Sequence, residues 1–87
     1  MKLNFKGKTA IVTGGSGGVG LSTVKELIKE KIHVLSLDIQ SPPNEILKNK
    51  YAHFQKIDLT QFEETKKIIN YFYKKNKSID YLVNTAG

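Results

Sequence analysis

Four short apolar runs, each bounded by turn-forming residues, recur along the chain. They cover residues 8–13, 32–37, 53–57 and 79–83, and they are rich in β-branched and aromatic side chains. Runs of this length and composition are typical of strands that are buried on both faces of a sheet. The pattern therefore predicts four β-strands.

The segments between these runs have the periodicity of helices. Apolar residues recur at helical spacing from Val19 to Ile28, with charged residues on the other side. A second apolar stripe ends at Phe72 and begins in TQFE, residues 60–63, which matches a capping box, so a helix is expected from about Gln61. Between the second and third runs, two prolines leave room only for a short helix or a turn.

This alternation of strands and helices predicts the α/β fold class. Strands joined by helices form a parallel sheet with right-handed crossovers. The expected strand order is 3-2-1-4, with the helix from Gln61 on the opposite face from the first helix. This is the first half of a Rossmann-like, doubly wound sheet, in which ligands bind at the carboxyl ends of the strands. Residues 1–87 are expected to form one truncated domain of this kind.

A glycine-rich stretch, TGGSGGVG at residues 13–20, directly follows the first predicted strand. Each glycine in an ordered element costs about 0.5 to 1 kcal/mol relative to alanine, so five of them indicate a close approach that side chains would block. A glycine turn from strand to helix directs N–H groups and the helix dipole at an anion such as phosphate. Gly15, Gly17 and Gly20 have dinucleotide-binding spacing, and Asp38 ends the second strand where a ribose ligand is expected.

With its context, this stretch resembles the short-chain dehydrogenase/reductase family. Residues 13–20 match the family's TGxxxGxG pattern, Asp58 in IDLT resembles its adenine-contacting aspartate, and NTAG at residues 84–87 resembles its NNAG. The chain departs from the pattern at Thr85, where a second asparagine is usual. The glycines also satisfy TGxxGxxG of the extended, epimerase-like branch, whereas NTAG favours the typical dehydrogenase branch.

The resemblance implies an NAD(P)-binding site at the carboxyl edge of the sheet. In the family, Thr13 ties the first turn to neighbouring backbone, and the end of the fourth strand lies beside the cofactor. The residues expected at the cofactor are Thr13, Gly14, Gly15, Ser16, Gly17, Gly18, Val19, Gly20, Asp38, Asp58, Leu59, Asn84, Ala86 and Gly87. Asp58 and Asn84 also suit purely structural roles, as a helix-approach residue and a turn residue.

Asp38 favours NAD over NADP as the cofactor. Its carboxylate can accept hydrogen bonds from both ribose hydroxyls, whereas a 2′-phosphate would meet a like charge. The sequence contains no arginine, and Gly17 offers no cation where NADP-dependent relatives often carry one.

The family's catalytic serine and Tyr-x-x-x-Lys unit follow the fourth strand, and the 87 residues stop before them. Tyr71 with Lys75 and Tyr73 with Lys77 match that spacing, but their helix precedes NTAG and is remote from the cofactor edge, so no catalytic residue is assigned. The expectation is the cofactor-binding part of an NAD-dependent oxidoreductase, inactive by itself. The alternatives are a complete small module that binds a nucleotide or a partner without catalysis, and a fragment of an extended, epimerase-like family member.

The amino-acid composition argues against several classes of binding partner. The net charge of +6 comes from scattered lysines without arginine, which favours a solvated surface over nucleic-acid binding. Cysteine is absent, and His33 and His53 are expected to stand singly, so no metal site is assigned. No apolar run suits a membrane span or a secretory signal, so we expect no membrane partner and a cytoplasmic location. The substrate stays open, and by resemblance the full-length protein is expected to be a homo-oligomer.

Overall fold

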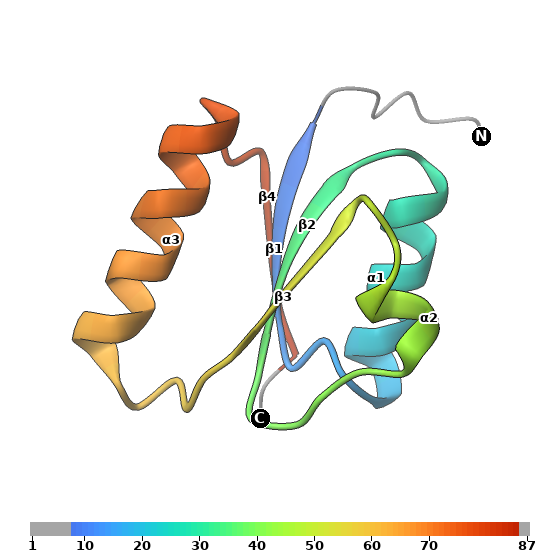
Figure 1. Cartoon of the computed structure of the whole chain (residues 1–87), viewed down its shortest axis with the longest axis horizontal. Helices are drawn as coiled ribbons and strands as arrows, with labels where there is room; N and C mark the ends of the chain where they lie inside the picture. Colours follow the sequence, from blue (N-terminus) through green and yellow to red (C-terminus); the bar gives the residue numbers. More distant parts are fainter. Residues whose placement is uncertain (1–7, 86–87) are drawn as a thin grey trace.

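The computed structural model describes residues 8–85, which form four strands and three helices in alternation (Figure 1). In chain order these are β1 (Thr9–Thr13), α1 (Gly18–Lys29), β2 (His33–Asp38), α2 (Asn44–Leu47), β3 (Ala52–Lys56), α3 (Phe62–Asn76) and β4 (Tyr81–Asn84). The strands lie within one or two residues of the four apolar runs. As expected, only a short helix follows the two prolines.

The four strands form one parallel sheet in the order β3-β2-β1-β4. Thr9 of β1 pairs with His33 of β2, and Ala10 of β1 pairs with Tyr81 of β4. All three pairings are parallel. The predicted Rossmann-like order 3-2-1-4 is therefore confirmed.

Helices cover both faces of this sheet (Figure 1). Alternate side chains of β1 point to opposite faces, because successive residues of a strand do so. Ala10 and Val12 pack with Val24 of α1 in one core cluster, whereas Ile11 packs with Phe72 of α3 in the other. The expectation that α3 lies across the sheet from α1 is confirmed.

The predicted capping box at the start of α3 is wrong. The helix begins at Phe62, and Gln61 occupies the N-cap position without a side-chain hydrogen bond to the helix. The Thr60 hydroxyl instead donates to Asp58 Oδ1 at 2.8 Å, and the Thr60 backbone N–H donates to the same oxygen at 2.9 Å. A local turn around Asp58 thus takes the place of the cap. Glu63, in the first helical turn, still suits the helix dipole.

Candidate cofactor site

The carboxyl ends of the four strands lie along one edge of the sheet, the lower edge in Figure 1. A cleft of about 220 Å³ opens there between the turns that follow β1, β2 and β3. Four of the predicted residues line it, Gly14, Asp38, Asp58 and Leu59, together with three further apolar side chains. Parallel pairing therefore brings together residues that are far apart in the sequence.

Two glycines set the shape of the turn after β1. Gly14 has φ +73° and Gly18 has φ +54°, in the left-handed region where a Cβ is strained. The Gly14 N–H donates to the carbonyl oxygen of Leu37 at 2.8 Å, so the turn begins while still tied to β2. A residue with a side chain at either glycine would strain the turn.

Two other glycines permit close packing. A Cβ added to Gly20 would lie 1.8 Å from the carbonyl oxygen of Gly14, so only glycine lets α1 start this close to the turn. A Cβ added to Gly15 would lie 2.3 Å from Ser36 Oγ. That hydroxyl is buried and has no hydrogen-bond partner in the described structure, and it fills the space under the turn. These two glycines thus let the turn pack closely against both α1 and the sheet.

The outer surface of the turn is open. A Cβ at Gly17 or Gly18 would meet nothing within 4 Å, and Val19 is 74% exposed. No side chain caps α1, and no acidic residue lies in its first turn. An uncapped helix N-terminus has free N–H groups, and the open space above it leaves room for an anion to bind them. These residues therefore fit a phosphate-containing cofactor.

Asp38 ties this turn to the end of β2. Its Oδ2 accepts the Ser16 backbone N–H at 3.0 Å, and its Oδ1 accepts the Gln40 backbone N–H at 3.0 Å. Partial burial opposes ionisation of Asp38, but hydrogen bonds from the backbone of Gln40, Ser16 and Ile39 outweigh it and hold the carboxyl pKa below its usual value. The Ser16 hydroxyl also donates to the Gln40 carbonyl oxygen at 2.5 Å. The cleft therefore carries a fixed negative charge at neutral pH.

The end of β4 is fastened to the same turn. The Thr13 hydroxyl donates to Asn84 Oδ1 at 2.7 Å, so its partner is a side chain rather than the neighbouring backbone expected from the resemblance. Thr85 supplies the backbone tie: its hydroxyl donates to the carbonyl oxygens of Thr13 at 2.6 Å and Gly14 at 3.2 Å. The sequence reasoning missed this role, and the only signal for it was the departure from NNAG. Ala86 and Gly87 lie outside the described residues.

Comparison with known proteins identifies the family. The family model for short chain dehydrogenases matches residues 8–87. The chain belongs to the short-chain dehydrogenase family.

Among curated relatives of this chain is sorbitol-6-phosphate 2-dehydrogenase from Klebsiella pneumoniae, 36% identical over 85 residues, which are 98% of this chain and 32% of that protein. A 3-oxoacyl-[acyl-carrier-protein] reductase from Buchnera aphidicola is 32% identical over 89 residues, 98% of this chain and 36% of that protein. This chain thus spans about a third of the length of these relatives.

Solved structures agree with this assignment. A short chain dehydrogenase from Leptospira borgpetersenii with bound NAD+ superimposes with a TM-score of 0.85 and 31% identity, over 97% of this chain and 33% of that one. The aldohexose dehydrogenase of Thermoplasma acidophilum, in ligand-free form, gives a TM-score of 0.78 and 31% identity, over 92% of this chain and 29% of that one. The described residues therefore have the amino-terminal part of the fold of this family.

Asp58 has a structural role in this chain. Hydrogen bonds from the backbone and the hydroxyl of Thr60 lower the pKa of its exposed carboxyl. These bonds form the turn that leads into α3, which is the structural alternative foreseen for this residue. Its contact with a cofactor stays a prediction.

The expectation that His33 and His53 stand singly is wrong. His33 Nδ1 and His53 Nε2 lie 3.1 Å apart, because the pairing of β2 with β3 places both side chains on the α3 face. They lie near the amino ends of their strands, away from the glycine turn. Within residues 8–85, no three histidine, cysteine, aspartate or glutamate side chains gather closely enough to hold a metal ion.

The tyrosines of the two accidental Tyr-x-x-x-Lys matches both lie on α3. Tyr71 and Tyr73 are both largely exposed, and Tyr71 lines a groove with His33, at the amino end of β2. Neither tyrosine lines the cleft at the glycine turn.

The described stretch from Lys8 to Thr85 holds no helix that is long and apolar enough to cross a membrane.

Proposed function

We propose that the chain is the cofactor-binding portion of an NAD-dependent dehydrogenase that transfers hydride between nicotinamide and an alcohol or carbonyl substrate. The observation that carries the proposal is the ionised Asp38 carboxylate at the rim of the cleft, hydrogen-bonded to the glycine turn. When bound, the cofactor supplies the hydride acceptor or donor. The substrate and the acid-base residues belong to the larger protein, since the relatives are about three times longer.

In this proposal each part of the site has a separate task. The N–H groups of residues 14–20 bind the pyrophosphate, and Asp38 binds the ribose next to the adenine. Asp58 and Leu59 lie beside the adenine. Asn84, Ala86 and Gly87 approach the nicotinamide half. The fixed turn and the open surface above Gly17 and Gly18 support this arrangement.

The charge of Asp38 supports NAD rather than NADP. Two like unit charges about 4 Å apart repel by about 4 kcal/mol at an effective dielectric constant near 20. Asp38 is only half-buried, so solvent weakens this repulsion, but a third of it already changes affinity about tenfold. Because the carboxylate already holds the Ser16 N–H, it cannot turn away from the site without losing that bond.

Calorimetric titration of the chain with NAD and NADP tests the proposal. We expect NAD to bind at least about tenfold more tightly, and we expect Asp38→Ala to weaken NAD binding and strengthen NADP binding. Glu30→Gln, an exposed acid at the far end of α1, is the matched control and should change neither affinity. Equal affinities for the two cofactors in the native chain would refute the role of Asp38 as selector, and binding of neither would refute the cofactor site.

A further inference from the structure

A second concave site lies on the α3 face of the sheet, beside β3. This groove has a volume of about 410 Å³ and shares no lining residue with the cofactor cleft. Its apolar floor includes Leu35 of β2 and Phe72 of α3, both buried. On the sheet side it is lined by His33, His53 and Phe54. Aromatic and aliphatic side chains therefore form most of its surface.

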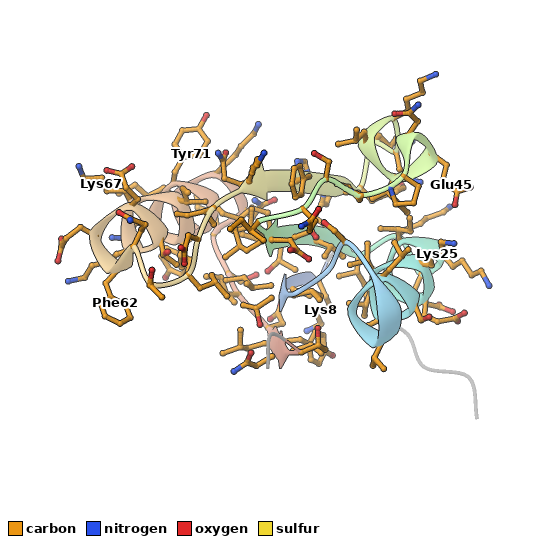
Figure 2. The ribbon with its side chains drawn as sticks, turned by 90° about the horizontal axis from the view of Figure 1, so that it is seen from below. Lys8, Lys25, Glu45, Phe62, Lys67 and Tyr71 are labelled. Carbon is orange, nitrogen blue, oxygen red and sulfur yellow. The ribbon has the colours of Figure 1, made fainter. Side chains whose placement is uncertain are left out.

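Helix α3 forms the other wall. Lys67, Tyr71 and Lys75 follow one another at intervals of four residues, so they share one side of the helix over about 12 Å. Ile68 lies next to this row and faces the groove. Figure 2 shows Lys67 and Tyr71 projecting from the same side of α3, whereas Phe62 projects from the opposite side. The helix thus gives the groove a cationic and aromatic rim.

The charges at this groove are of one sign. Among the described residues that line it, none is acidic. Lys67 has an exposed ion pair with Glu64 at 3.8 Å, which contributes little in water, and Lys75 has no ion pair within residues 8–85. Burial first, and then the charges of His33 and Lys75, lower the pKa of His53. The groove therefore disfavours a further positive charge and is complementary to an anion.

We propose that this groove binds an aromatic carboxylate of one or two rings, with the ring against Phe72 and Tyr71 and the carboxylate beside Lys75. The volume falls in the range of small-molecule sites, which are about 300 to 1,000 Å³ and mostly apolar with a few polar groups. Stacked or edge-on rings attract one another beyond the effect of the area they bury. The cationic rim selects the charge of the ligand.

The probe pair for the test is naphthoate and its neutral isostere naphthamide, titrated into the chain and followed by NMR shifts of the groove residues. We expect naphthoate to bind about two- to fivefold more tightly than naphthamide, the range that an exposed ion pair provides. Lys75→Gln should remove this preference without changing naphthamide binding. Lys66→Gln, an exposed neighbour outside the groove, is the matched control and should leave both affinities unchanged.

Tyr71→Ala should weaken both probes, and circular dichroism shows whether that variant stays folded. Should it unfold, the Lys75→Gln and Lys66→Gln pair still decides the outcome, because both lysines are exposed. Equal binding of the two probes, or equal effects of the two lysine substitutions, would overturn the proposal. Displacement of naphthoate by NAD would overturn it too, since that places the probe in the cofactor cleft.

Discussion

Gly20 has no room for a side chain. The atom that a Cβ would strike is a backbone carbonyl oxygen, that of Gly14, which cannot rotate aside as a side chain can. Any larger residue must push α1 away from the turn. The contact fixes the relation between the end of β1 and the start of α1, on which the candidate cofactor site depends.

We predict that Gly20→Ala destabilises the chain by about 1 to 3 kcal/mol, the range for overpacking a well-filled site. Urea unfolding followed by circular dichroism measures it. Gly17→Ser is the matched control in the same turn, because Gly17 has an extended backbone with open space around it and serine is a better N-cap. Its unfolding midpoint should be unchanged or slightly higher. Equal losses in both variants would contradict the steric explanation.

At the scale of elements, the pairing of β2 with β3 creates the contact between His33 and His53. Two imidazoles 3.1 Å apart share one hydrogen bond readily but resist a second positive charge. Burial of His53, and then the charges of His33 and of Lys75 from α3, disfavour its protonation. The lowered pKa of His53 makes this contact sensitive to acid.

We predict that the chain loses stability as the pH falls below about 6.5. The unfolded state binds a proton at His53 near its ordinary pKa, whereas the folded state binds it only at lower pH, so acid favours unfolding. Urea midpoints at pH 7.5 and 5.5 measure the loss. His53→Gln should reduce the difference between the two midpoints. An unchanged difference in that variant would place the acid sensitivity elsewhere.

The end of α3 gives another prediction at this scale. Lys77 follows the helix with φ +68°, in the left-handed region, and its N–H donates to the Tyr73 carbonyl oxygen at 2.6 Å. We expect Lys77→Gly to raise the unfolding free energy by about 0.5 to 1 kcal/mol, because glycine adopts this conformation without strain. Lys74→Gly, inside the helix, should lower it by about 1 kcal/mol. Chemical unfolding that ranks the two variants the other way would contradict this explanation.

The strand order followed from the sequence because apolar runs alternating with amphipathic helices leave few topologies once crossovers are right-handed. The glycine turn and Asp38 were predictable for a similar reason, since their spacing along the chain is local. The His33–His53 contact was not, because it depends on the register of two strands. The capping box failed because Asp58 offered the Thr60 hydroxyl a competing partner, and sequence spacing does not rank such alternatives.

At the scale of the whole molecule, the sheet is covered on both faces but open beside β4. Among the described strands, β4 pairs only with β1, and Leu82 is 69% exposed. A parallel sheet is normally buried. The exposed apolar edge at β4 buries little surface, and a small domain has little other buried surface to compensate for it. The 87-residue chain by itself is therefore expected to be marginally stable.

We predict a low melting temperature for the chain alone, raised by NAD. At a hundred times its dissociation constant a ligand adds about 2.7 kcal/mol, which is a large fraction of the stability of a small domain. Thermal melting with and without NAD measures this shift. A sharp, high transition of the unliganded monomer would contradict marginal stability.

We also predict no turnover of alcohols or carbonyls by the 87-residue chain with NAD(H). The exposed Tyr71 and Tyr73 lie outside the cofactor cleft, so no described tyrosine is positioned there as an acid or base. Absorbance of NADH across a substrate panel measures turnover. Activity that disappears in Tyr71→Phe or Tyr73→Phe would show that one of these tyrosines is catalytic.

The hydrogen bonds that join Asn84 and Thr85 to the end of β1 and its turn also determine when the candidate site can form during synthesis. A ribosome adds about 5 to 20 residues per second and releases the chain from its amino terminus. β1, β2 and β3 can pair while β4 is still unmade, but Thr13 and Gly14 meet partners that are 71 or 72 residues downstream. The nascent chain therefore holds an open central strand edge beside β1 until β4 leaves the ribosome, and that interval is when the chain is most exposed to wrong pairing.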